Sequence, residues 1–436
     1  MKTIVITNFG AVKKVNVQMD RNMQVFIGPQ ASGKSTIGKV IYFVRKIRDY
    51  TFEFLLDAEQ FSTNHPNEYF TNYLKYLTRQ FMGCFGTTKH MDAFSIQYNI
   101  NDSTYIHIAL VDKYVRFSMS SDLKKSVEQL ITEARALFLR KQNERTFSFF
   151  NKFSELDTFR TELETQLFAI FDDDSEIIYI PAGRSLLASM SEQLYDIPLS
   201  QMDLTMQEFI RLTRTAKNSF NAKIPDVIER YTRTVKGQIN NLAVKQAYNL
   251  IKKILHADYV NDTDGEKMYF DDEHWVELMY SSSGQQESLW ILQLLFATIL
   301  EQRKSFCVIE EPEAHLFPSG QRDIVNLISL MVNATQSQVI ITTHSPYVLT
   351  SLNVLLYSDR IESRLKNRTA DEVIPRNYRL KASGFTAYKI LIKDNERHIL
   401  QSIFDNDTGL IDASYIDEVS ETTNTDLEKL IALDSL

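Results

Sequence analysis

The stretch Phe26-Ile27-Gly28-Pro29-Gln30-Ala31-Ser32-Gly33-Lys34-Ser35-Thr36 decides the fold of this chain. It matches the phosphate-binding pattern G-x-x-x-x-G-K-[ST]; the residues before it predict a strand and those after it a helix. Glycines let the backbone turn its N–H groups toward phosphate oxygens, and the helix N-terminus adds a favourable field. The residues expected to contact the nucleotide are Gly28, Gln30, Ala31, Ser32, Gly33, Lys34, Ser35 and Thr36.

Within this loop two side chains have specific expected roles. Lys34 would reach the β- and γ-phosphates, and the hydroxyl of Ser35 would bind Mg2+. The sequence therefore predicts ATP and Mg2+ as ligands.

The composition of the 436 residues is that of an ordinary globular protein, with 44% hydrophobic and 24% charged residues. Two cysteines cannot form a disulfide framework, which suits a reducing compartment. The first residues alternate in polarity, unlike a signal peptide, and the longest apolar run, Leu289 to Leu300, is too short to span a bilayer. We therefore expect a cytoplasmic protein without a membrane partner.

Charge is unevenly spread along the chain, although the net charge is only −8. Residues 211–253 carry ten Lys or Arg against two acidic residues, and residues 405–436 carry nine acidic residues against one Lys. A solvated face explains such runs, but the basic one also suits a nucleic-acid contact. Nucleic acid bound through 211–253 thus remains one option.

The rest of the chain alternates between strands and helices. Residues 2–27 predict two or three strands, and short alternating strands are expected at 93–100, 104–111 and 113–119. Helices are expected from Phe52 to Phe81, as a pair from Asp122 to Asp172, and as a block from about 190 to 256, with a buried strand at Ile177 to Ile180. This pattern indicates an antiparallel sheet beside the phosphate site and helical insertions.

Three further motifs follow residue 280. In Ser281 to Glu287, small residues at the start of an apolar helix expose N–H groups to an anion. Phe306 to His315 is an apolar strand ending in two glutamates, of which one can hold Mg2+ and the next can orient or deprotonate water. Val339 to Pro346 is another apolar strand with a histidine at its end. Each motif alone fits a structural role, but their order behind a phosphate loop favours an ATP site.

Together these motifs resemble those of the ABC-type ATPases of the RecF, SMC and OLD group. Ser282-Ser283-Gly284-Gln285 resembles the signature motif, and His344 resembles the switch histidine. Glu310 takes the Walker B position and Glu311 the catalytic position. The family pattern often continues Leu-His-Pro where this chain has Leu316-Phe317-Pro318.

The resemblance implies that each ATP lies between the phosphate loop of one protomer and the signature motif of another. A homodimer or higher even oligomer would then be needed for hydrolysis. Glu311 and His344 would be catalytic, and Ser35 with Glu310 would bind the metal. The implied contacts from the partner are Ser282, Ser283, Gly284 and Gln285.

A loop that senses the γ-phosphate is expected after the strand at Ile177 to Ile180, where the chain continues Pro181-Ala182-Gly183-Arg184. The usual glutamine is not evident there, so Arg184 is the candidate ATP contact. An arginine buried beside an acidic core residue is an equal alternative.

The predicted fold class is α/β: an ABC-type ATPase head with a P-loop core sheet, an antiparallel β lobe and helical insertions. The expected units are an ATPase lobe at 1–120, a helical insertion at 121–175, a sensor-loop strand with a basic helical lobe at 176–275, the lobe with the signature, Walker B and switch histidine at 276–395, and an acidic C-terminal tail at 396–436.

The resemblance implies a dimerisation switch driven by ATP, as in the sensor ATPases of bacterial anti-phage defence systems, which control a separate effector. A RecF-like DNA-maintenance ATPase is the alternative. A transporter subunit ranks last, because about 250 residues separate Lys34 from Gly284. No Toprim-type nuclease is expected: no Glu-Gly pair follows His344, Asp405-Asn406-Asp407 suggests a turn, and Gly409 to Leu436 suggests a short acidic helix.

Overall fold

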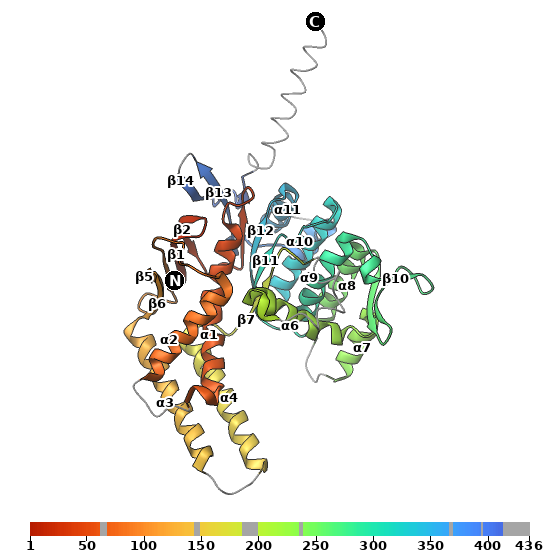
Figure 1. Ribbon diagram of the computed structural model, residues 1–436. Coiled ribbons are helices and arrows are strands. Elements are labelled where there is room, and N and C mark those ends of the chain that lie inside the picture. Colours follow the sequence, from red (N-terminus) through yellow and green to blue (C-terminus); the bar gives the residue numbers. More distant parts are fainter. Residues whose placement is uncertain are drawn as a thin grey trace.

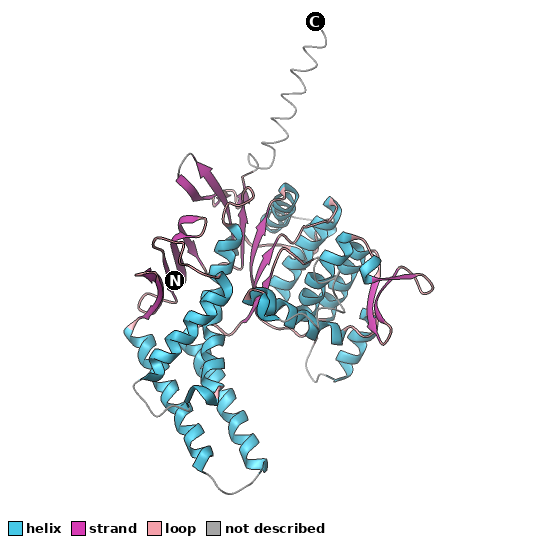
Figure 2. Cartoon of the chain, viewed as in Figure 1, coloured by secondary structure: helices cyan, strands magenta, loops and turns pink. Residues whose placement is uncertain are grey.

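The computed structural model describes residues 1–61, 68–143, 149–184, 199–234, 239–365, 369–393 and 396–412. One large sheet runs through the molecule, and the helices form a group on each side of its central strands (Figure 1). Figure 2 shows the same division by secondary structure. The predicted α/β class is confirmed.

Four neighbouring strands of the sheet are parallel, and three of them carry the predicted motifs at their carboxyl ends. These strands are β3 (Met23–Ile27), β12 (Gln338–Thr343), β11 (Ser305–Glu310) and β7 (Glu176–Ile180). Ile27 pairs with Thr343, and Thr342 pairs with Glu310. The phosphate loop, the histidine and the glutamates therefore begin at one edge of the sheet.

Antiparallel strands continue the sheet beyond this core, as the alternating segments predict. These strands are β1 (Thr3–Phe9), β2 (Val12–Gln18), β4 (Ser95–Asn99), β5 (Tyr105–Val111) and β6 (Tyr114–Met119). Among the described residues the sheet has eleven strands in the order β6-β5-β4-β1-β2-β14-β13-β3-β12-β11-β7.

The strands β13 (Phe385–Lys393) and β14 (Glu396–Ser402) correct the expectation of an acidic tail from residue 396. β13 lies parallel to β3, and β14 lies beside β2, so this hairpin joins the two halves of the sheet. The chain then forms a short hairpin, β15 (Phe404–Asp405) and β16 (Leu410–Ile411). The expected acidic helix falls largely on 413–436, outside the described residues.

Helices cover both faces of the parallel core. They are α1 (Lys34–Leu56), α2 (Tyr69–Phe85), α3 (Ser121–Asn143), α4 (Phe149–Phe171), α6 (Leu204–Ser219), α7 (Ile224–Thr234), α8 (Asn241–Leu255), α9 (Ser283–Leu300), α10 (Pro318–Thr335) and α11 (Pro346–Glu362). Side chains alternate along each strand, so in β7 Ile178 and Ile180 pack with α9 and α10, whereas Ile177 and Tyr179 pack with α1. In the described part of the chain, every helix is too short or too polar to cross a membrane.

A second sheet, which the sequence analysis did not predict, connects the basic helices to α9. Its strands are β8 (Asp258–Asp262), β9 (Gly265–Tyr269) and β10 (Trp275–Glu277), in the order β10-β9-β8. These strands are short and rich in acidic residues, so they lack the apolar alternation on which strand prediction depends.

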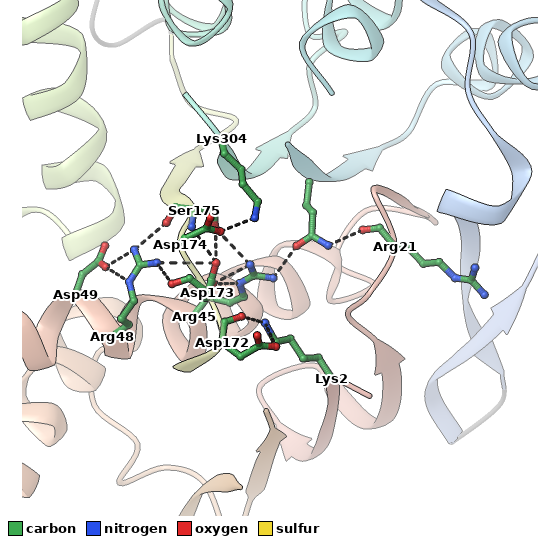
Figure 3. Close-up of polar contacts among 11 residues, drawn as sticks. Lys2, Arg21, Arg45, Arg48, Asp49, Asp172, Asp173, Asp174, Ser175 and Lys304 are labelled. Atoms are coloured by element: carbon green, nitrogen blue, oxygen red, sulfur yellow. Dashed lines mark hydrogen bonds and ion pairs between the residues drawn. The ribbon is translucent and has the colours of Figure 1, made fainter. Parts of the chain in front are cut away.

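A buried polar network fixes the base of the α3–α4 pair to α1 (Figure 3). The Nε and Nη2 atoms of Arg45 each lie 2.8 Å from Oδ2 of Asp173, which follows α4. Arg48 donates to the carbonyl oxygens of Asp173 and Ser175 at 2.7 and 2.8 Å. The helix that begins at the phosphate loop is therefore tied to the returning end of the insertion.

Candidate functional site

The phosphate loop has the backbone conformation that its sequence predicts. Gly33 has φ 93°, in the left-handed region that favours glycine, and Ala31 has φ 57°. α1 begins at Lys34, and in the described part of the chain no side chain caps its N-terminus. Its first N–H groups therefore remain available for an anion.

Lys34 is held within the loop and close to the acidic strand end. Its Nζ donates to the carbonyl oxygens of Gly28 and Pro29 at 2.8 and 2.9 Å. Burial lowers the pKa of Lys34 to about 8, against the opposing effect of the nearby Glu311, Glu313 and Glu310 carboxylates. A bound phosphate would replace the carbonyl contacts and favour the charged amine.

Two elements outside the motif also shape the phosphate loop. A Cβ on Gly28 would lie 3.0 Å from the carbonyl oxygen of Ile390, so β13 packs directly against the loop. On another side, the turn between β1 and β2 and residues 90–93 line a groove of about 620 Å³. This turn touches the loop, because a Cβ on Gly33 would lie 3.2 Å from Val12.

The two glutamates after β11 occupy different environments. Glu310 is 5% exposed; its Oε2 accepts a hydrogen bond from Ala182 N at 3.1 Å, while Oε1 is buried and has no hydrogen-bond partner among the described residues. Glu311 has φ 43°, and its N–H donates to the carbonyl of Thr342 at 2.8 Å. Its side chain is 36% exposed, and Oε1 lies 3.3 Å from Nε2 of His344. One carboxylate is thus buried, whereas the next is open to a reactant.

Glu313 fixes the loop that carries the histidine. Its Oε1 accepts a hydrogen bond from the backbone N–H of His344 at 3.0 Å and another from the hydroxyl of Thr343. The Glu313 side chain is therefore used for positioning. No role for Glu313 was predicted from the sequence, although the run Glu311-Pro312-Glu313 contained the signal.

Of the two predicted metal ligands, Ser35 is exposed and Glu310 has the chemistry that suits Mg2+. The unpartnered buried oxygen of Glu310 is the kind of atom that a cation or its water ligands satisfy. Within the described ranges, no three His, Cys, Asp or Glu side chains gather as a metal site. Mg2+ that is bound with a nucleotide needs only one or two protein ligands, because phosphates and waters supply the others.

The signature residues lie at the start of α9. Ser282 and Gln285 form a reciprocal capping box, and Nε2 of Gln285 also donates to the carbonyl of Leu255 at 2.7 Å. Ser283 is exposed. A Cβ on Gly284 would lie 2.7 Å from the carbonyl oxygen of His315, so this position needs glycine within its own chain. Ser283 is thus the signature side chain that remains free to reach a ligand.

Arg184, the candidate ATP contact, is buried within its own chain. Its side chain is 0% exposed, and its guanidinium donates to backbone carbonyls at 2.7 to 3.2 Å. The nearest acidic group is the buried carboxylate of Glu287, at 3.8 Å. The structure therefore favours the buried arginine over the expected ATP contact.

The structure gives ion pairs for four of the ten cations in the basic stretch 211–253. Lys217, Lys223 and Lys252 pair with acidic residues at 3.0, 2.6 and 3.0 Å, and Arg233 pairs with Glu229 on its own helix. The three acidic partners are Glu266, Asp272 and Asp258. Lys236 lies outside the described residues. Three of these lysines thus have their partners in the segment 258–272.

The fold and the site define a P-loop nucleoside triphosphatase, in which a phosphate loop, paired glutamates and a histidine share one edge of a parallel core sheet. Comparison with protein families gives the same answer: the family described as AAA ATPase domain matches residues 1–349. The chain belongs to this family.

Among solved structures, the chain is similar to three SMC heads. The SMC head bound to the C-winged helix domain of ScpA is 11% identical, with a TM-score of 0.42 and coverage of 92% of this chain and 97% of that chain. The SMC head domain from Thermotoga maritima is 9% identical, with a TM-score of 0.37 and coverage of 92% and 98%. The SMC head with an extended coiled coil, bound to the C-terminal domain of ScpA derived from Pyrococcus furiosus, is 11% identical, with a TM-score of 0.40 and coverage of 92% and 97%. No curated protein matches the chain.

Proposed function

We propose that this chain is a Mg2+-dependent ATP hydrolase of the ABC type, in the RecF, SMC and OLD group, whose active sites are completed by a second copy of the chain. The observation that best supports ATP hydrolysis is the register of three adjacent strands. Ile27 pairs with Thr343, and Thr342 pairs with Glu310, so the three motifs follow neighbouring strand ends, which supports one shared nucleotide position.

The residues at this edge have different proposed roles in the transfer of the γ-phosphoryl group to water. Lys34 and the N–H groups of the loop bind the phosphates, and Ser35 with Glu310 would hold Mg2+, which neutralises charge on the β- and γ-phosphate oxygens. Glu311 orients the attacking water and accepts its proton, and His344 orients the γ-phosphate. The groove beside the β1–β2 turn is our candidate site for the adenosine part.

A second copy is proposed because the signature motif presents groups that its own chain leaves unused. Ser283 is exposed at the N-terminus of α9, where helix N–H groups favour an anion. Around it, Met279, Tyr280 and Phe317 are 51%, 72% and 79% exposed. Exposed apolar side chains that cluster in this way typically mark a protein interface.

Complementation tests the shared site. Lys34→Ala removes the phosphate contact, and Ser283→Glu places a negative charge at the signature motif; each should be inactive alone. Mixing them should restore partial activity, because one site in each mixed dimer combines an intact phosphate loop with an intact signature motif. Gly284 is unsuitable for this test, since a side chain there would displace its own chain. Mixed dimers that form but stay inactive would contradict the shared site.

As a biological role we propose a cytoplasmic switch that controls a separate effector protein in anti-phage defence, on the basis of the resemblance to the ATPases of such systems. The DNA-maintenance alternative has less support, because four of the ten cations that motivated it are ion-paired with carboxylates of the same chain. Both are tested by measuring DNA binding at about 50 mM salt, where phosphate contacts are strong. Tight, salt-sensitive binding would favour DNA maintenance; its absence, together with capture of a specific protein only in the ATP-bound state, would favour the switch.

A further inference from the structure

Arg184 is a fully buried arginine whose hydrogen bonds connect the catalytic strand end to the signature helix. Nη1 donates to the carbonyls of Pro181 and Glu310, both at 2.7 Å, and Nη2 donates to the carbonyl of Glu311 at 2.8 Å. Nε donates to the carbonyl of Glu287 at 3.2 Å. One side chain therefore holds the end of β7, the end of β11 and the first turns of α9.

Glu287 supplies the charge that balances this arginine. It lies one turn after Ser283, and its side chain is only 4% exposed. Its Oε2 lies 3.8 Å from Nε of Arg184, and its Oε1 lies 3.8 Å from Nε2 of His315. His315 in turn presents its carbonyl oxygen to Gly284. The first turns of α9 are thus tied both to Arg184 and to the loop after Walker B.

Glu311 needs such support, because a non-glycine residue with φ 43° is strained and keeps that conformation only if its surroundings fix it. Its N–H is held by Thr342, and its carbonyl is held by Arg184. These two contacts fix the peptide groups on both sides of the Glu311 side chain. The direction of the catalytic carboxylate therefore depends on the position of Arg184.

We propose that Arg184 and Glu287 are positioning residues that couple the two ATP sites of the dimer. The proposal rests on the proposed function, in which Glu311 acts on the ATP of its own chain and α9 acts on the ATP of the partner. When the signature motif closes on the partner's γ-phosphate, α9 shifts, and Glu287 with Arg184 carries this shift to Glu311. Each site then hydrolyses ATP faster when the other is filled, and a single filled site keeps a lower rate.

The test uses two variants that break the link at different points. Glu287→Gln removes the charge but keeps the shape and the backbone acceptor. Arg184→Lys keeps a charge for Glu287 but cannot reach all the carbonyls. The matched control is Glu266→Gln, which breaks the buried pair with Lys217, where the side chains are 8% and 10% exposed and the distance is 3.0 Å.

Both test variants should bind ATP like the parent in a direct titration, because the phosphate loop is unchanged. Their kcat should fall about 10- to 100-fold, since small displacements of a catalytic group have effects of this size. The Hill coefficient for ATP should fall from above one in the parent to one in both variants. Glu266→Gln should lower thermal stability while kcat and the Hill coefficient stay at the parental values.

Several results would overturn the coupling. They are an unchanged kcat and Hill coefficient in folded Glu287→Gln, a Hill coefficient of one in an active parent, or an equal loss in Glu266→Gln. If Arg184→Lys does not fold, Glu287→Gln alone decides. A parent that hydrolyses no ATP refutes the proposed function itself, whereas an active parent with normal variants refutes only the coupling.

Discussion

Nε2 of His344 lies 3.3 Å from Oε1 of Glu311, so the side chains that follow two neighbouring strands meet at the edge of the sheet. They are 32% and 36% exposed, which leaves room for a reactant beside them. The backbone behind each is fixed, because Glu313 holds the N–H of His344 and Thr342 holds the N–H of Glu311. The pair is thus aligned before any ligand binds, which supports the proposed catalytic role.

The first prediction concerns Glu311→Gln. The amide cannot accept a proton from water, so kcat should fall about 10²- to 10⁴-fold, the usual effect of a general base. ATP binding should persist, and an ATP-bound dimer should accumulate in size-exclusion chromatography with Mg2+. Glu301→Gln, at a surface carboxylate, is the control and should keep parental turnover. Hydrolysis by Glu311→Gln near the parental rate would remove Glu311 from the mechanism.

The second prediction is that His344 and Glu311 act as one unit. His344→Ala should lower kcat while ATP still binds. The double variant should then be about as slow as Glu311→Gln alone, because groups that act together have non-additive effects. Steady-state rates of the four proteins give the answer. If the two losses multiply, the residues work independently despite their contact.

The local motifs could be predicted from the sequence, and the structure brings them together. The phosphate loop, the glutamates and His344 each follow a short apolar strand, and carboxyl ends of parallel strands share an edge. β13 and β14 were missed, because their partners β3 and β2 lie more than 350 residues earlier in the chain and the charged strand β14 resembles a tail. A local pattern does not reveal which strand a distant segment will join.

The environment of Arg184 could not be predicted from the sequence, for a related reason. Its acceptors come from three segments that are distant in sequence, near Pro181, Glu287 and Glu310. An arginine at a strand end is equally compatible with a ligand contact and with burial until these segments are placed. The acidic strands that pair with the basic helices were missed similarly, because charge hid their weak alternation.

The third prediction is that ATP affinity falls with rising pH through Lys34. Its pKa is lowered to about 8, so the amine is mostly charged near neutral pH and mostly neutral one unit above that value. Binding a polyanion then requires proton uptake, and affinity should drop about tenfold between about pH 7 and about pH 9. Lys34→Arg stays charged in this range and should bind with little pH dependence. Equal parental affinity at both pH values would show that Lys34 is not the phosphate contact.

The fourth prediction concerns the stability of the network in Figure 3. Asp173→Asn leaves the buried Arg45 without its counter-charge and should reduce the free energy of unfolding by about 3–5 kcal/mol. The neighbouring Asp174 pairs with Lys304, but their side chains are 58% and 48% exposed. Asp174→Asn should therefore cost only about 0–1 kcal/mol. Urea denaturation of both variants provides the comparison, and similar losses in the two would contradict the ranking.

The last prediction is that the chain cuts neither DNA nor RNA and acts through a separate protein. The expected turn at Asp405 is present: Oδ1 of Asp405 accepts from the N–H of Asp407 at 2.9 Å, and Gly409 N donates back to the Asp405 carbonyl at 2.8 Å. This carboxylate is thus engaged in its own turn. In the described part of the chain it joins no cluster of three acidic, histidine or cysteine residues, whereas two-metal cleavage needs several carboxylates around two nearby ions.

Purified protein should hydrolyse ATP and leave plasmid DNA and RNA intact with Mg2+ or Mn2+. Cleavage that follows the pure chain and disappears in Asp405→Asn with Asp407→Asn would establish a nuclease site at this turn, whereas cleavage unaffected by that double change would place it elsewhere in the chain.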